Sequence, residues 1–158
     1  MKKLLLSLAF VAMGFSVSAQ SSGFNLGADV GFPTGDVKDL FSLTMTVNAT
    51  YMLGESDQFD YGVAASYSYW KGKDGVDNGS FLPLAGALRF NASETFVLGT
   101  DIGYAIGVSP SQNDGGFYYK PMVGYNFSDN MMLQASYSGV SVDGGTYSNF
   151  GIGIMFGM

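Results

Sequence analysis

The sequence contains no cysteine and no histidine, and only 13% of its 158 residues are charged, against a usual share of about 25%. Without cysteine, disulfides, thiolate metal sites and a cysteine nucleophile are excluded. Without histidine, most metal chemistry and most general-base chemistry near neutral pH are excluded as well. Only 7 residues are basic against 13 acidic, so the chain lacks the positive charge of a nucleic-acid surface. We therefore expect no catalytic residue, metal, cofactor or nucleic-acid partner.

Glycine and the aromatic residues are abundant instead, with 23 Gly, 13 Phe and 10 Tyr. So few charges are unusual on a soluble surface, and so many aromatic residues are unusual in a disordered chain. The composition therefore indicates an ordered chain whose outer surface does not face water in the ordinary way. The length fits about one domain.

The first residues resemble a targeting segment. Lys2 and Lys3 precede a short apolar core over 4–15, and the small residues Val17-Ser18-Ala19 follow. This order is typical of a secretory signal peptide, and the core is too short to span a bilayer. We predict a cleaved signal peptide over residues 1–19 and one mature domain over residues 20–158. The alternative for 1–19 is a buried N-terminal helix.

The mature chain alternates between apolar and polar residues with a period of two. The pattern is clearest over 41–53, where the odd positions are apolar and the even positions from 42 to 50 are Ser, Thr or Asn. No helix keeps this period. Similar segments predict eight strands, at 24–32, 41–53, 59–69, 81–90, 96–108, 117–127, 131–139 and 147–158. Pro83 and Pro121 fall inside two of them, where we expect a bulge or a strand start because proline cannot donate to the ladder.

The connections between these strands alternate in length. Long polar connections fall near 33–40, 71–80, 109–116 and 140–146, and short ones near 54–57, 91–95 and 128–130. The short ones repeat a serine and an acidic residue before the next strand, beginning at Ser56, Ser93 and Ser128. Such side chains fix tight turns by accepting backbone hydrogen bonds. An even number of antiparallel strands with short turns on one side is typical of a membrane barrel.

The composition of the two faces indicates which face looks outward. The apolar face carries no charge, and the polar face is mostly small residues with five charges, Asp29, Asp60, Arg89, Asp101 and Lys120. A soluble surface would carry about 25–35% charged residues, whereas small residues suit the inside of a narrow barrel. We therefore predict an all-β fold, an eight-stranded antiparallel up-and-down transmembrane β-barrel. A soluble lipocalin-like carrier of apolar ligands is the alternative.

The positions of the aromatic residues suggest two girdles at two membrane interfaces. One set lies near the short turns: Tyr51, Phe59, Phe90, Phe96, Tyr125 and Phe156. The other set lies near the long connections: Phe32, Phe41, Tyr69, Trp70, Phe117 and Tyr119.

Together these features resemble small bacterial outer-membrane β-barrel proteins, more narrowly the porin-like proteins with an "outer membrane protein beta-barrel domain". The resemblance implies location in the outer membrane of a Gram-negative envelope, with outer-membrane lipid around the barrel. It also implies termini and short turns in the periplasm and long loops outside the cell. Some enzymes among such small barrels use histidine, which this chain lacks.

The last strand resembles the C-terminal assembly signal of that family, which the barrel-insertion machinery recognises. Its apolar face consists of Phe150, Ile152, Ile154, Phe156 and Met158. The segment departs from the common form because it ends in Met158 rather than an aromatic residue, a place that Phe156 can take.

The five charges of the polar face should point into the lumen. We expect them to form an ion-pair network that closes it, with Arg89 beside Asp60 on adjacent strands and the other three nearer mid-height. A proton or ion relay, or a gated pore, is the alternative. The predicted function is that of a monomeric outer-membrane barrel with a structural or surface-interaction role. A narrow channel or transport accessory is the rival.

Overall fold

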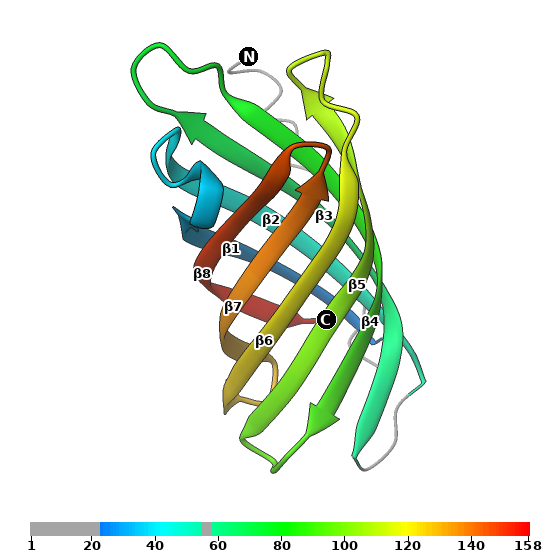
Figure 1. Ribbon diagram of the computed structural model, residues 1–158. Coiled ribbons are helices and arrows are strands. Elements are labelled where there is room, and N and C mark those ends of the chain that lie inside the picture. Colours follow the sequence, from blue (N-terminus) through cyan, green and yellow to red (C-terminus); the bar gives the residue numbers. More distant parts are fainter. Residues whose placement is uncertain (1–22, 55–57) are drawn as a thin grey trace.

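The computed structural model describes residues 23–54 and 58–158, and these form one closed antiparallel barrel in which each strand pairs with the next and the first closes on the last (Figure 1). The strands are β1 (Phe24–Thr34), β2 (Phe41–Gly54), β3 (Phe59–Gly72), β4 (Gly79–Asn91), β5 (Phe96–Ser109), β6 (Gly116–Ser128), β7 (Met131–Val142) and β8 (Gly145–Gly157). The predicted eight-stranded up-and-down barrel is confirmed. The predicted signal peptide lies outside the described residues.

One end of the barrel, the loop end, carries the connections 35–40, 73–78, 110–115 and 143–144 (Figure 1). The first of these contains a single helical turn, η1 (Gly35–Val37). No helix in 23–54 or 58–158 has the length and apolar character needed to cross a membrane. The loops are shorter than predicted because ladder pairing continues past the last clear alternation. The β7–β8 ladder extends to Val142 and Gly145, and a tight turn with Gly144 at φ 95° joins the two strands.

The opposite end, the short-turn end, carries the connections 92–95 and 129–130. Ser93 works as its sequence pattern predicts: its hydroxyl oxygen accepts the backbone N–H groups of Thr95 at 3.2 Å and Phe96 at 3.0 Å. These bonds fix a tight turn and direct the chain into β5. The third short connection, which contains Ser56, lies partly outside the described residues.

The expectation of a bulge or a strand start at the two prolines was wrong. Pro83 lies within β4, and Pro121 lies within β6. Pairing is interrupted beside each proline on one side only, toward β3 and β7 respectively, and resumes in the same register. Pairing toward β5 continues through both prolines. The missing N–H donor of each proline therefore interrupts pairing with one neighbouring strand only, and the register of that pair does not change.

Most apolar side chains of the barrel point outward, and its polar side chains at mid-height point inward. Val30, Ile102 and Ile152 are 52%, 52% and 54% exposed on the outer face, and similar side chains cover every strand. On the inner face, Asp101 and Lys120 are each only 4% exposed. This distribution is the reverse of that in a water-soluble domain, which buries its apolar groups. It agrees with the face assignment made from composition.

Two residues assigned to the aromatic girdle near the loop end lie inside the barrel instead. Phe41 is 4% exposed and Trp70 is 1% exposed. A register shift between Phe41 and Leu43 in the β2–β3 ladder turns Phe41 inward. Trp70 follows the outward Tyr69 and so faces inward by simple alternation. The assignment of these two residues to a lipid-facing girdle was therefore wrong.

Candidate functional site

The lumen is the candidate functional site, and its loop end is filled by an aromatic plug. We define the aromatic plug as Val37, Phe41, Trp70, Phe81, Tyr118, Val140 and Tyr147. Its ring centroids lie close together, at 5.7 Å for Phe41 and Trp70 and 5.1 Å for Phe81 and Tyr147. Val37 comes from the η1 turn and is 5% exposed, so the β1–β2 connection covers this end of the barrel. These side chains therefore pack against one another inside the loop end of the barrel.

A buried ion pair crosses the lumen below the aromatic plug. Lys120 Nζ of β6 lies 2.8 Å from Asp29 Oδ2 of β1, two strands that are not neighbours in the barrel. Lys120 also donates to Asn48 Oδ1 of β2 at 3.0 Å. Asp29 accepts two further hydrogen bonds, at 2.7 Å from Asn48 Nδ2 and at 2.6 Å from Gln134 Nε2 of β7. Ser66 of β3 donates to Asn48 Oδ1 at 3.0 Å. Five strands are thus joined across the barrel, and both charges have polar partners, which burial requires.

Arg89 and Asp101 form a second ion pair, between adjacent strands β4 and β5. Arg89 Nη1 lies 2.7 Å from Asp101 Oδ1. The hydrogens of Nη1 are directed elsewhere, because this atom donates to the carbonyl oxygens of Leu88 at 3.0 Å and Thr100 at 3.2 Å. The contact with Asp101 is therefore mainly Coulombic, since a hydrogen bond also needs a well-aligned donor.

Asp60 lies directly opposite Arg89 in the β3–β4 register, as the sequence predicts. Its carboxylate Oδ2 accepts a hydrogen bond from Asn91 Nδ2 at 2.9 Å. The ion pair shown for Arg89, however, is with Asp101 on the other neighbouring strand. The structure therefore brings Asp29 together with Lys120 and Arg89 with Asp101, and it places Asp60 nearer the short-turn end. The role of these five residues in closing the lumen stays a prediction.

The partners Asn48, Gln134 and Ser66 were not singled out from the sequence. Each lies on the polar side of an alternating strand, which signals that it faces the lumen. Alternation does not show how far along the barrel axis each inward residue lies. Residues of non-adjacent strands contact each other across the lumen only when they lie at the same level along that axis.

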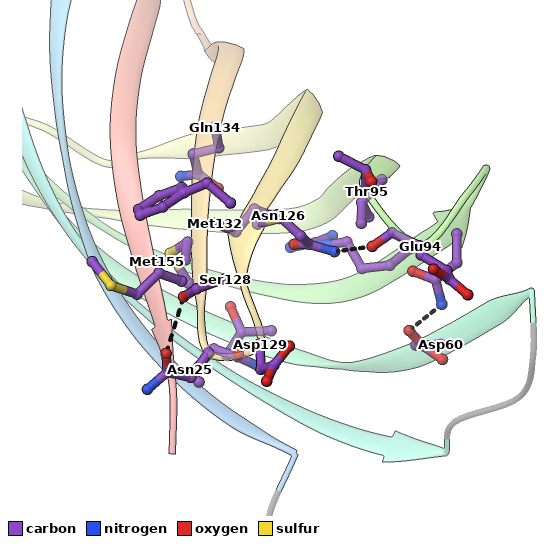
Figure 2. Close-up of a pocket in the computed structure, with 18 of the residues that line it drawn as sticks. Asn25, Asp60, Glu94, Thr95, Asn126, Ser128, Asp129, Met132, Gln134 and Met155 are labelled. Carbon is purple, nitrogen blue, oxygen red and sulfur yellow. Dashed lines mark hydrogen bonds between the residues drawn. The ribbon is translucent and has the colours of Figure 1, made fainter.

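A vestibule occupies the lumen at the short-turn end (Figure 2). It has a volume of about 580 Å³. Met132 and Met155 lie on one side, and Asp60 and Glu94 lie on the other. Deeper in the lumen, between the ion pairs and the aromatic plug, lies a small cavity of about 10 Å³. A wide void therefore lies at the short-turn end, and buried side chains occupy the lumen from mid-height toward the loop end.

In residues 23–54 and 58–158, no three His, Cys, Asp or Glu side chains gather as metal ligands would. The inner carboxylates Asp29 and Asp101 are each next to a cation instead.

No protein-family model and no curated protein sequence matches the chain. Solved structures do match. The outer membrane enzyme PagL aligns with a TM-score of 0.65 at 16% identity, over 85% of this chain and 99% of that one. The chain has the fold of the small outer-membrane β-barrels. The attachment invasion locus protein Ail of Yersinia pestis aligns with a TM-score of 0.56 at 16% identity, over 85% and 96%. The N-terminal β-barrel domain of Pseudomonas aeruginosa OprF aligns with a TM-score of 0.55 at 17% identity, over 87% and 98%.

At these identities the likeness establishes the fold alone. The similar structures include an enzyme and a protein named for attachment and invasion, so the fold does not select between catalysis and adhesion. The narrower porin-like resemblance stays a prediction, because no family model matches.

Proposed function

We propose that the chain is an integral outer-membrane protein with a closed lumen and a structural or surface-interaction role. The observation that carries this proposal is the reversed polarity of the barrel. Its outer face is covered by side chains such as Val30 and Ile102, each 52% exposed, while Asp29 and Lys120 are buried inside. Exposing so much apolar surface to water is unfavourable, whereas lipid is the solvent that such a face suits. An apolar-ligand carrier would need the opposite arrangement.

The closed lumen supports a role other than bulk transport. An eight-stranded barrel has an interior just wide enough for side chains. Here the aromatic plug and the Asp29–Lys120 network occupy it from the loop end to mid-height. The vestibule favours the second candidate, a narrow channel or transport accessory, because it already opens the short-turn end of the lumen.

The surface role would lie in the loops of the loop end, which we place outside the cell. They are too short to form a separate binding domain. We propose a non-catalytic role because the sequence has no histidine or cysteine to act as base or nucleophile.

We further propose that the barrel is a monomer surrounded by lipid and assembled by the barrel-insertion machinery. Phe150, Ile152, Ile154 and Phe156 face outward on β8, the strand that closes the barrel against β1. Met158 donates its backbone N–H to the carbonyl of Phe24 at 2.9 Å, which holds the end of the chain at that seam. The last strand therefore presents an apolar face for recognition before the barrel closes.

Fractionation and conductance test the proposal together. We expect the protein to stay in outer-membrane fractions after salt and carbonate washing and to be released only by detergent. Release without detergent would overturn the membrane assignment. Reconstituted in planar bilayers, the wild-type protein should carry no steady current, with its insertion verified by protease protection. A steady open current would instead establish the channel candidate.

A further inference from the structure

We propose that the vestibule is a binding site for an amphiphilic organic cation, a molecule with an ammonium or guanidinium group on an apolar body. The volume of about 580 Å³ lies within the range of about 300–1,000 Å³ that is usual for small-molecule sites. The vestibule is open at the short-turn end and closed above by the ion-pair layer, so a ligand would enter from one side only. The proposal concerns the vestibule alone, so its failure would leave the proposed membrane role untouched.

The charges at the vestibule are unbalanced. Its lining includes three carboxylates, those of Asp60, Glu94 and Asp129, and a single basic group, Arg89. Even when that guanidinium is set against Asp60, the carboxylates of Glu94 and Asp129 remain. The vestibule therefore has a net negative charge that favours a cation.

The lining also offers hydrogen-bond acceptors to a ligand. Four amide side chains of the lining each donate one N–H to the protein itself: Asn25 to Gly23, Asn91 to Asp60, Asn126 to Glu94 and Gln134 to Asp29. Gln134 is 3% exposed, and its Oε1 accepts no hydrogen bond from the described residues. Amide oxygens such as that of Gln134 therefore remain as acceptors for a ligand that carries N–H groups.

The wall beside these acceptors is apolar and adaptable. Met52, Met131, Met132 and Met155 line the vestibule together with Val97 and Phe127. Met132 and Met155 lie directly opposite each other in the β7–β8 register. Unbranched thioether side chains adjust to ligands of irregular shape, and they contact aromatic rings favourably. A ligand with an aromatic or aliphatic body and N–H groups would satisfy both parts of the lining.

A dye-binding titration tests the proposal. The protein is placed in nanodiscs of neutral phosphatidylcholine and titrated with rhodamine 6G, a cationic aromatic dye with N–H donors, while fluorescein serves as the anionic counterpart. We expect saturable binding of rhodamine 6G beyond that of empty nanodiscs and none of fluorescein. The double variant Glu94→Gln/Asp129→Asn should weaken rhodamine binding about fivefold, since each exposed charge contributes modestly. The matched variant Asp74→Asn/Asp77→Asn, at the loop end, should leave it unchanged.

Methionine methyl NMR locates the dye. The methyl signals of Met132 and Met155 should shift on binding, while that of Met45, which is 47% exposed on the outer face, should not. The proposal would be overturned by the absence of saturable binding, by equal binding of fluorescein, by equal weakening in both double variants, or by shifts confined to Met45.

Discussion

Removing the Lys120 ammonium should destabilise the barrel strongly, because it leaves the Asp29 carboxylate buried without its counter-charge. Truncating one partner of a buried pair costs about 3–5 kcal/mol. Asp29 would keep its hydrogen bonds from Asn48 at 2.7 Å and Gln134 at 2.6 Å. These two bonds continue to solvate the charge, so Lys120→Ala should lower the free energy of unfolding by about 3 kcal/mol, the lower end of that range.

Removing the Asp29 carboxylate should lower the free energy of unfolding more than removing the Lys120 ammonium. Asp29→Ala leaves Lys120 with one hydrogen bond, to Asn48 Oδ1 at 3.0 Å, and it removes the acceptor of both amide NH₂ groups. We expect a loss of about 5 kcal/mol, the upper end of the range. The double variant removes both charges, so it should be less destabilised than the sum of the single variants by about 2 kcal/mol.

The lone tryptophan of the sequence is the reporter for this cycle. Trp70 is 1% exposed in the aromatic plug, so its emission should shift to the red when the barrel unfolds in urea from lipid vesicles. Lys73→Ala, at an exposed lysine that donates to the carbonyl of Lys38, is the control and should cost less than about 1 kcal/mol. The reasoning would be refuted if Lys120→Ala and Asp29→Ala each lowered the free energy of unfolding by less than about 1 kcal/mol. It would also be refuted if the loss in the double variant equalled the sum of the two single losses.

Three further changes test other parts of the barrel. Ile102→Arg places a charge on the outer face and should destabilise the folded barrel by about 2–4 kcal/mol, measured by urea titration in vesicles, whereas a neutral effect would mean that this face does not meet lipid. Trp70→Ala should cost about 3–5 kcal/mol through the cavity left in the aromatic plug, which loss of heat-resistant mobility on detergent gels would report. Gly103→Ala should cost about 1–3 kcal/mol by urea titration monitored by circular dichroism, because the added methyl would meet the carbonyl oxygen of Leu84 on β4 and a backbone atom cannot turn away. An unchanged midpoint for Gly103→Ala would contradict that close approach.

The strands were predictable because alternation is a local signal. The segment predicted over 96–108 is β5, Phe96–Ser109, and the segment predicted over 41–53 is β2, Phe41–Gly54. The composition of the two faces also identified the outward one correctly. Alternation failed at Phe41, because a bulge at a strand end reverses the facing of a single residue and leaves no mark in the pattern.

The candidate site was predictable residue by residue but not pair by pair. The sequence placed Asp29, Arg89, Asp101 and Lys120 in the lumen, and the structure has each of them buried. The Lys120–Asp29 contact joins residues on opposite sides of the barrel, so it depends on strand stagger, which a period of two does not contain. Arg89 lies between two neighbouring strands, and its side chain extends toward Asp101 on β5. The alternation of apolar and polar residues does not predict toward which strand an inward side chain extends.

Quenching by brominated lipid tests the central claim most directly, namely that the apolar face meets lipid while the aromatic plug lies inside. In vesicles of brominated phosphatidylcholine, Trp70 of the wild-type protein should keep its fluorescence, because it is 1% exposed in the lumen. The Ile102→Trp variant should add an emission component that the same lipid quenches, because Ile102 is 52% exposed on the outer face. Strong quenching of Trp70, or an Ile102→Trp component that brominated lipid does not reach, would contradict the account.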